Sequence, residues 1–247
     1  MKLYKLKYLI PLVLVATLWI ILSYLKIFDP IFLPPFKGVF SSFINLFNSD
    51  FLLNQLLPSF KRVMGAFLIS TAIALPVGVL CGISKRISDF INPLFSFIRY
   101  LPVAAMVPLT ILWFGIDDSQ KIAVITIGIV FQLTLMIALS IEAVPVELIE
   151  TGTIMKLSRR QQIFKIILPY SMPSIWDSLR IAAGWAWSYL VLSELVAGSH
   201  GVGYFIVQSQ RYLQIENVFA GILYIGVLGL LTDVFFRLIQ MRFFRWK

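Results

Sequence analysis

Long apolar runs constrain the fold of this sequence more than any other feature. A helix needs about 20 apolar residues to cross the hydrocarbon core of a bilayer. Because 59% of the residues are hydrophobic and only 13% are charged, the composition differs from that of a soluble domain. We therefore expect an all-α, polytopic membrane protein with about six transmembrane helices. The runs predicted to span the membrane are 8–25, 62–82, 93–115, 120–141, 176–197 and 217–238.

The third run, 93–115, is the least regular, because Pro93, Pro102 and Pro108 interrupt it. A proline in a membrane helix is tolerated where protein or water satisfies the freed carbonyl groups. We therefore expect this segment to face the interior of the bundle or a cavity rather than lipid. An ordinary kinked packing helix is the alternative interpretation.

The N-terminus shares a basic start and an apolar run with secretory signal peptides. It is long enough to span a bilayer, however, and no small-residue cleavage site precedes the next polar stretch. We interpret it as a retained transmembrane helix. The chain is accordingly divided into an N-terminal helix with its outer segment, residues 1–57, and a transmembrane core, residues 58–247.

The distribution of Lys and Arg indicates the orientation. With the N-terminus inside, the cytoplasmic segments hold Lys2, Lys5, Lys7, Lys85, Arg86, Lys156, Arg159, Arg160, Lys165, Arg237, Arg242, Arg245 and Lys247. The outer segments hold the smaller group of Lys26, Lys37, Lys61, Arg62, Lys121 and Arg211. Because basic residues are enriched on the cytoplasmic side, an N-in, C-in topology is favoured. The net charge of +9 is thus a membrane feature, and we expect no nucleic-acid partner.

The chain has one cysteine, Cys81, and one histidine, His200. A single cysteine forms no disulfide within the chain, and zinc or iron sites generally need several His or Cys ligands. An intramembrane enzyme would need a nucleophile with its base, or metal ligands. We therefore predict no catalytic residues and no metal site, and we place His200 in a glycine-rich surface loop.

The charged segment 142–175 breaks the apolar pattern. Helical periodicity runs from Val146 to Met155 and from Arg160 to Leu168, and Pro169 and Pro173 are expected to end the second helix. Two short helices with an exposed apolar stripe are typical of a knob that docks into a groove on a partner. A solvated connector lying on the lipid headgroups is the alternative.

This segment resembles the cytoplasmic loop of ABC-importer permeases, which reads EAA, three residues, Gly, nine residues and Ile-x-Leu-Pro. Glu150-Thr151-Gly152 stands at the EAA position, Lys156 replaces the glycine, and Ile166-Ile167-Leu168-Pro169 matches the ending. If the family's glycine adopts a backbone angle that other residues avoid, the turn at Lys156 must differ slightly.

Further motifs, spread over roughly residues 30–247, resemble the nitrate, sulfonate and taurine branch of these permeases. They are Leu33-Pro34-Pro35, the segment from Pro108 to Lys121, Leu179-Arg180, Gly184-Trp185-Ala186-Trp187, Ser193-Glu194-Leu195, Gly201-Val202-Gly203-Tyr204, Phe219-Ala220-Gly221, Gly226 and Asp233.

The resemblance implies the permease subunit of an ABC importer in a prokaryotic plasma (inner) membrane. Two copies, as a homodimer, or one copy and a close relative would form the pathway, and a periplasmic or lipid-anchored binding protein would deliver the substrate. A pair of ATPase subunits would bind ATP and Mg²⁺, because this chain lacks a G-x-x-x-x-G-K-[ST] pattern. The implied substrate is a small anion such as nitrate, a sulfonate or taurine, or a small heterocyclic nutrient. No cofactor is expected in this chain.

The resemblance also implies which residues couple the chain to the ATPase: Glu147, Glu150, Thr151, Gly152, Lys156, Ile166, Leu168 and Pro169. Glu150 is expected to contact the ATPase or to cap the turn. Ile166 and Leu168 are expected to make apolar contacts, and Pro169 to fix the exit toward the fifth span.

Candidate pathway residues lie in the fifth span: Arg180, Trp185, Tyr189, Ser193 and Glu194. Trp185 and Tyr189 share a helix face that Trp187 does not. At helical spacing Arg180 can pair with Asp177, and Arg237 with Asp233. A stand-alone secondary transporter or channel is the rival function, since it would carry an ion-coupling carboxylate deep in a span. Glu194 is the only acidic residue partly placed for that role.

Overall fold

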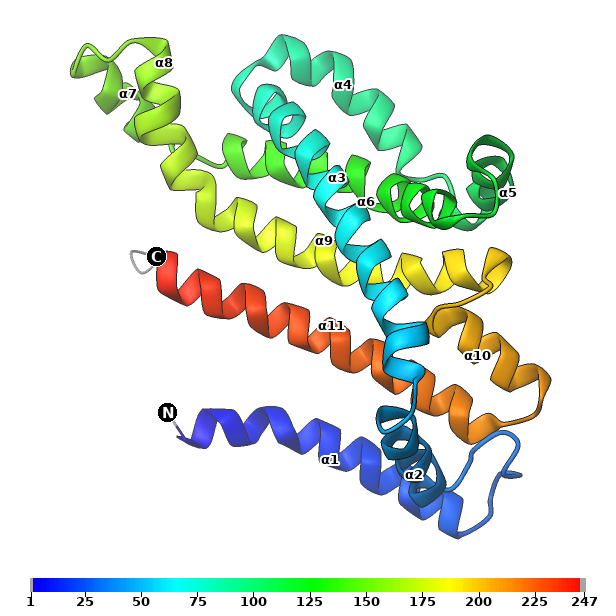
Figure 1. Cartoon of the computed structure of the whole chain (residues 1–247). Helices are drawn as coiled ribbons and strands as arrows, with labels where there is room; N and C mark the ends of the chain where they lie inside the picture. Colours follow the sequence, from blue (N-terminus) through cyan, green and yellow to red (C-terminus); the bar gives the residue numbers. More distant parts are fainter. Residues whose placement is uncertain (1, 245–247) are drawn as a thin grey trace.

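The computed structural model describes residues 2–244, except for the side chains of residues 2–9, 12 and 197. Within these residues the chain is all-helical (Figure 1), as predicted. The side chains of Lys2, Lys5 and Lys7, and all of Arg245 and Lys247, lie outside the described residues. The elements are α1 (Lys2–Tyr24), α2 (Phe36–Phe47), η1 (Leu52–Leu56, a π-helical segment), α3 (Leu57–Ile83), α4 (Lys85–Ile98), α5 (Val103–Phe114), α6 (Asp118–Glu142), α7 (Val146–Ile154), α8 (Arg159–Gln162), η2 (Ile163–Ile167, also π-helical), α9 (Leu168–Ala197), α10 (Val202–Arg211) and α11 (Ile215–Phe243).

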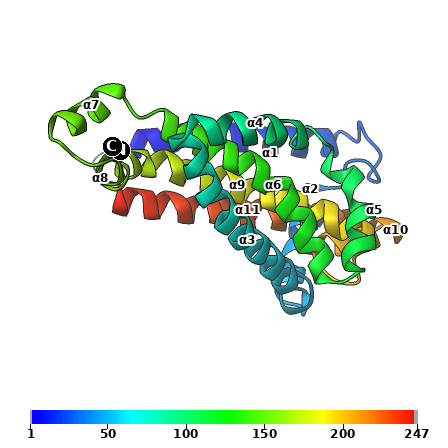
Figure 2. The ribbon, with the colours of Figure 1, turned by 90° about the horizontal axis from the view of Figure 1, so that it is seen from above.

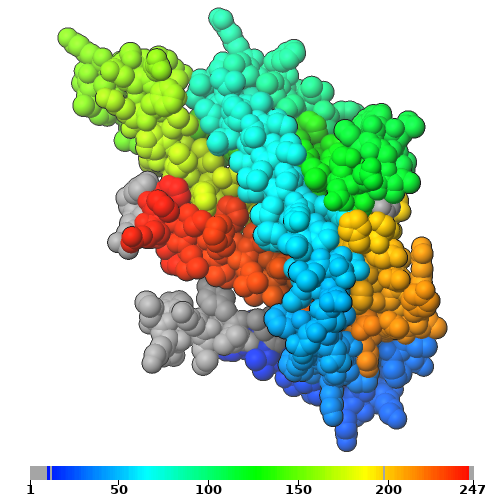
Figure 3. All heavy atoms as spheres, in the orientation of Figure 1, coloured from blue at the N-terminus to red at the C-terminus, as the bar shows by residue number. Residues whose placement is uncertain are grey.

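The axes of the long helices α1, α6, α9 and α11 lie roughly side by side, with α1 and α9 running opposite to α11, and α3 crosses them (Figures 1 and 2). One end of the bundle, which we call the inner end, holds α7, α8, the start of α1 and the end of α11. The opposite, outer end holds α10 and the connection from α5 to α6. In the space-filling view α7 and α8 project from the inner end (Figure 3).

Three helices of the described residues are long and apolar enough to cross a membrane: Leu52–Ile83, Asp118–Glu142 and Ile215–Phe243. The number rises to four if α4 and α5 form one broken span. The apolar stretch described in α1, Val13–Tyr24, is shorter. Although α9 has 30 residues, it carries Asp177, Arg180 and Glu194 and is not among the three. Helices occupy the six predicted ranges, but a six-span topology stays a prediction.

The prediction of one interrupted helix over 93–115 is wrong. The range falls on two helices, α4 and α5, whose axes differ by 95°. The break comes before Pro102, which is the extended N-cap residue of α5, because a residue that precedes proline disfavours the helical conformation. Pro93 and Pro108 lie inside α4 and α5 and end neither helix.

The prediction that Pro169 and Pro173 end a helix is also wrong. The helical conformation continues from Arg159 through α8, η2 and α9 to Ala197. Just before Pro169 the chain widens into a π turn, in which the Leu168 N–H donates to the Ile163 carbonyl. Proline has no backbone N–H to donate, and its ring crowds the preceding turn. A wider π turn gives the ring room and lets the helix continue. Pro58 follows the π segment η1 in the same way, since the Leu57 N–H donates to the Leu52 carbonyl.

The core lies where α3, α6 and α9 meet, and α3 approaches α6 closely at two glycines, Gly78 and Gly82. A Cβ atom added to Gly78 would lie 2.7 Å from Ile137 Cβ and 2.8 Å from the Thr134 carbonyl oxygen. Small residues at a helix contact allow the backbones to approach closely within a membrane. Gly78 therefore sets the α3–α6 distance.

We expect Gly78→Ala to lower the Tm of the purified chain in detergent, because the added methyl group meets backbone that does not move aside. Overpacking of this kind costs about 1–3 kcal/mol. Gly226→Ala is the matched control, since nothing lies within 4 Å of a Cβ atom there and alanine favours the helix by about 1 kcal/mol. Shifts of the same sign in both variants would contradict this account of the packing.

Candidate functional site

Residues 146–167 form a projection at the inner end that we call the knob. Its second helix, α8, begins with a capping box in which the Ser158 N–H donates to Gln161 Oε1 at 2.8 Å and Ser158 Oγ accepts from the Gln161 N–H. Arg159 Nη2 donates to the Ile83 carbonyl at 2.9 Å. This carbonyl belongs to the last residue of α3, where helix carbonyls lack partners. The knob is thereby tied to the end of α3.

Helix α7 ends in a Schellman motif at Lys156. The Leu157 N–H donates to the Gly152 carbonyl at 3.0 Å, and the Lys156 N–H donates to the Thr153 carbonyl at 2.9 Å. Lys156 has a φ of 56°, the left-handed value that this motif requires and that favours glycine. The turn thus has a left-handed angle with a lysine in place, and a difference from the family's turn stays a prediction.

The two helices of the knob touch at Gly152. A Cβ atom there would lie 2.6 Å from Ile166 Cδ1 and 3.3 Å from Gln162 Cγ. Gln162 also donates to Thr153 Oγ1 at 3.1 Å. Gly152 and Ile166 therefore hold the knob together from within.

The outward face of the knob mixes apolar and acidic side chains. Ile154 is 80% exposed, and Val146, Met155 and Phe164 are more than half exposed. The predicted coupling residues Glu147, Glu150 and Thr151 are exposed, as is Pro169, whereas Leu168 is half-buried. Within the described residues neither Glu147 nor Glu150 makes an ion pair. The surface has the composition of a docking face, with apolar side chains among free charges.

The outer end holds a polar cluster, the outer cluster, in which the buried Ser59, Arg62 and Glu194 meet the more exposed Asp118 and His200. Arg62 and Glu194 are 1% and 0% exposed and form an ion pair at 2.6 Å. Arg62 also pairs with Asp118 at 2.6 Å and lies 2.7 Å from the His200 ring. Ser59 Oγ donates to Glu194 Oε1 at 2.7 Å. Multiple charged hydrogen bonds are what a buried pair needs in order to be stable.

Two glycines at the start of α10, the N-cap Gly201 and the second helical residue Gly203, make room for this cluster. Gly201 has a φ of 119°, and a Cβ atom there would overlap the Glu194 carboxylate. The Gly203 N–H donates to Glu194 Oε2 at 2.8 Å, and a Cβ atom on Gly203 would lie 2.8 Å from Glu194 Cβ. The cluster thus explains both glycines of the Gly201-Val202-Gly203-Tyr204 motif.

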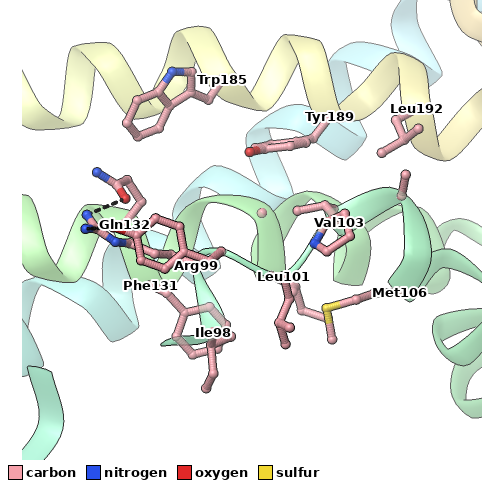
Figure 4. A pocket seen from close by; sticks show the side chains of 15 residues that line it. Ile98, Arg99, Leu101, Val103, Met106, Phe131, Gln132, Trp185, Tyr189 and Leu192 are labelled. Atoms are coloured by element: carbon pink, nitrogen blue, oxygen red, sulfur yellow. Dashed lines mark hydrogen bonds between the residues drawn. The ribbon is translucent and has the colours of Figure 1, made fainter. Parts of the chain in front are cut away.

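A cavity of about 510 Å³ lies between the α4–α5 corner, α6 and α9 (Figure 4). Tyr189 packs directly on Gly128, where a Cβ atom would lie 2.6 Å from the ring. Arg99 and Gln132 line the same space, and the hydroxyl end of Tyr189 points to the side where they and Trp185 lie. The lining residues are Ile98, Arg99, Tyr100, Leu101, Pro102, Val103, Ala104, Met106, Ile127, Gly128, Phe131, Gln132, Trp185, Tyr189 and Leu192. The expectation that 93–115 faces the interior or a cavity is met at the residues that line this cavity but not at Leu112 and Trp113, which are 78% and 59% exposed on the single chain.

The candidate pathway residues fall in different places. Trp185 and Tyr189 line the cavity, whereas Trp187 faces α11 and donates to Thr232 Oγ1 at 3.1 Å, as the helical spacing predicted. Arg180 is engaged in ion pairs at the α9–α11 contact, with Asp177 at 3.5 Å and Asp233 at 3.2 Å. The predicted pair of Arg237 with Asp233 is also present, at 2.8 Å.

Ser193 and Glu194 are fully buried and do not line this cavity. The Ser193 hydroxyl donates to the Leu190 carbonyl at 2.8 Å within α9, and Glu194 belongs to the outer cluster. A role for either residue in the pathway stays a prediction.

A family comparison decides the class of protein. The family described as "Binding-protein-dependent transport system inner membrane component" matches residues 74–245, more than half of the chain. The chain belongs to this family. It is a permease component of an ABC transporter, a multi-pass protein of the inner membrane, and a transport subunit rather than an enzyme. No cofactor is expected in this component.

Similar proteins confirm the resemblance to the sulfonate and taurine branch. A putative aliphatic sulfonates transport permease protein, SsuC of Bacillus subtilis, is 35% identical and covers 97% of this chain and 86% of its own length. The taurine transport system permease protein TauC of Escherichia coli is 29% identical and covers 95% and 87%. The bicarbonate transport system permease protein CmpB of Synechococcus elongatus is 30% identical and covers 78% and 68%.

Solved structures of ABC transporters share the fold of this permease. A chain of the MetNI methionine ABC transporter, in an inward-facing conformation, superposes with a TM-score of 0.64 at 20% identity and covers 76% of this chain and 94% of its own. A chain of an amino acid ABC transporter with histidines has a TM-score of 0.63 at 17% identity and covers 83% and 97%. At these identities the likeness concerns the fold alone.

Sequence reasoning missed two groups in this permease. Ser59 and Arg62 stand three residues apart at the start of an apolar helix, and this spacing on one helix face was the available signal for the outer cluster. Their partner Glu194 was treated as a separate residue. Gln132, which meets Arg99 in the cavity, is an uncharged residue in an apolar run, and nothing in the local pattern marked it.

We expect Glu194→Gln to lower the Tm of the permease strongly, because it removes the buried one of the two carboxylates that pair with Arg62 at 2.6 Å. Breaking a buried ion pair costs about 3–5 kcal/mol. Asp233→Asn is the control, since its partners Arg180 and Arg237 are partly exposed and such pairs contribute about 0–1 kcal/mol. Thermal unfolding in detergent checks both. Equal losses of Tm would show that the outer cluster does not stabilise the fold as described.

We expect Lys156→Gly to slow hydrogen exchange at the Leu157 amide, which bonds to Gly152. The substitution relieves a left-handed angle that costs an ordinary residue about 1–2 kcal/mol, so the expected change is roughly fivefold or more. Arg160→Gly, at an exposed position inside α8, is the opposite control because glycine weakens a helix. Faster exchange in Lys156→Gly would rule out strain at this turn.

Proposed function

We propose that this permease spans the membrane with six helices, N-in and C-in, and imports a small anion with energy from partner ATPase subunits. The observation that carries the proposal is the knob: a compact, exposed projection at the inner end whose outward face offers apolar side chains and unpaired acids. The excess of Lys and Arg in the segments at this end supports a cytoplasmic location.

The knob would dock in a groove on the ATPase subunit. Glu147, Glu150 and Thr151 would supply polar contacts there, and Val146, Ile154 and Met155 apolar ones, since these side chains are exposed. Lys156 would set the angle between the two short helices. ATP binding that closes the ATPase pair would then move the knobs and bias the bundle between inward-open and outward-open states.

The pathway would form between two copies of this chain, as a homodimer, with a periplasmic or lipid-anchored binding protein delivering substrate at the outer end. Many large apolar side chains of the described residues are exposed on the single chain, which is the surface expected of a protein bounded by lipid and by a second copy. Trp185 and Tyr189 would contribute to the pathway through the cavity they line.

A small anion is the substrate class that the relatives favour. The printed names of three of them specify aliphatic sulfonates, taurine and bicarbonate. An alkyl sulfonate fits the chemistry that the three share, which is one oxyanion group on a compact body. The rival function, a stand-alone secondary transporter or channel, loses its candidate ion-coupling carboxylate, because Glu194 is held by Arg62 and Ser59.

The first test is a gentle detergent pull-down of the tagged chain from its host, with stoichiometry measured by mass spectrometry. We expect one ATPase copy per permease chain. Glu150→Arg, and deletion of residues 156–160, are expected to reduce the recovered ATPase at least tenfold, which corresponds to about 1.4 kcal/mol, while the spans stay folded.

Asp50→Arg is the matched control, because it reverses an exposed acid outside the knob and should leave recovery unchanged. Retention of the ATPase by both knob variants would remove the knob from the coupling role. Recovery of the chain alone, still competent for transport, would instead support the secondary transporter.

A further inference from the structure

The cavity contains one charged side chain, and it is a cation. Of the residues that line the cavity, Arg99 alone is ionised at neutral pH, and no Asp or Glu is among them. Within the described residues Arg99 takes part in no ion pair. Its partners are neutral: Arg99 Nη1 donates to Gln132 Oε1 at 3.3 Å, and Nη2 donates to Tyr100 Oη at 3.0 Å. The positive charge of the cavity is therefore uncompensated.

Arg99 lies far from both ends of the membrane-spanning helix α6, where a cation without an acidic partner calls for an explanation. Gln132 lies fourteen residues after the start of α6 and ten before its end, hence about 21 Å and about 15 Å from the two ends at 1.5 Å per residue. Arg99 reaches Gln132 and so lies near mid-depth of a helix that is apolar enough to span the membrane. An ionised side chain at that depth is costly and commonly marks the path of a substrate or ion.

Two other basic residues of the bundle are neutralised by ion pairs, and the buried ammonium of Lys121 is held by the carbonyls of Ile116 and Asp117. Arg180 pairs with Asp177 and Asp233, and Arg62 pairs with Asp118 and Glu194. Arg99 differs from both because it is exposed in the single chain and its guanidinium contacts only neutral acceptors. A guanidinium in this state can bind an oxyanion by two parallel hydrogen bonds.

We propose that the cavity is a substrate site in which Arg99 binds the single oxyanion group of the transported molecule. Gln132 orients the guanidinium, and the 3.3 Å bond between them is long enough to yield when a stronger acceptor arrives. Trp185 and Tyr189 enclose the body of the molecule, and the Tyr189 hydroxyl offers one further donor on the same side (Figure 4).

The dimensions and walls of the cavity limit the ligand. A volume of about 510 Å³ is in the usual range for small-molecule sites, and the lining is otherwise aromatic, aliphatic or amide. The cavity therefore suits a compact molecule with one negative group and a small apolar or neutral body, such as an alkyl sulfonate. Because no acidic residue lines the cavity, a cationic nutrient would meet only repulsion from Arg99. This inference rests on the proposed import function, since it places the site on the transport path.

Protection from an arginine reagent tests the site directly. The purified full-length chain is treated with phenylglyoxal, and modification of Arg99 is followed by mass spectrometry with and without methanesulfonate. We expect methanesulfonate to slow modification of Arg99 at least threefold. Dimethyl sulfone, which is similar in size but neutral, should give no protection at the same concentration. Arg86, exposed on the same helix α4, is the internal reference and should react equally in all samples.

A second measurement uses variants. The Tm of the wild-type chain should rise with methanesulfonate concentration, Arg99→Gln should abolish the rise, and Arg99→Lys should retain part of it, because a lysine keeps the charge without the planar fork. Equal reaction of Arg99 with and without methanesulfonate, or an undiminished Tm rise in Arg99→Gln, would overturn the inference.

The ATPase pull-down separates this inference from the proposed function. Arg99→Gln should still recover the ATPase, since Arg99 lies between α4 and α5 and this corner is at the other end of α4 from α7 and α8 (Figure 1). ATPase recovery together with unprotected Arg99 would refute the anion site and leave the permease function intact. Loss of ATPase recovery in the wild-type chain would refute the proposed function whatever the protection result.

Discussion

The buried pair of Arg62 and Glu194 is the interaction on which the outer end of this permease depends. Two charges withdrawn from water are stabilised only when hydrogen bonds satisfy their remaining donors and acceptors. Those bonds come from Ser59 on α3, Asp118 at the start of α6, and the backbone at the start of α10. The ends of separate helices must therefore converge on one point, and the start of α10 must carry glycines there. The geometry of the whole outer end follows from this requirement.

A single continuous helical stretch connects this outer cluster with the knob. From Arg159 to Ala197 the chain passes through α8, η2 and α9 without a break, a length of about 58 Å at 1.5 Å per residue. The knob occupies its first turns, Trp185 and Tyr189 stand in its final third, and Glu194 lies near its end. A displacement of the knob would be carried toward the cavity wall, while the outer cluster holds the far end. The π segment η2 is the irregular turn where such a displacement could change the direction of the helix.

Sequence patterns predicted the parts of this structure that depend on local chemistry. Hydropathy located helices over the six ranges, and spacing identified the short helices of the knob and the shared face of Trp185 and Tyr189. The wrong helix boundaries all concern proline, because the effect of a proline depends on the conformation of the residues before it. A π turn precedes Pro169 and the helix continues, whereas a 95° corner lies before Pro102. The outer cluster escaped prediction because it joins Arg62 to a residue more than a hundred positions away. Pairings of that kind are set by tertiary packing.

The outer cluster also determines which charges are left unpaired near the pathway. In the sequence Glu194 stands near the end of the fifth span as an unpaired acid, and an acid there would oppose the passage of an anion. In the structure Glu194 is paired with Arg62 at 2.6 Å, and this positive charge weakens the field of the carboxylate along the pathway. Arg180 is matched in the same way by Asp177 and Asp233. The one full charge left along the cavity is that of Arg99, and its sign favours the kind of molecule that the relatives' names describe.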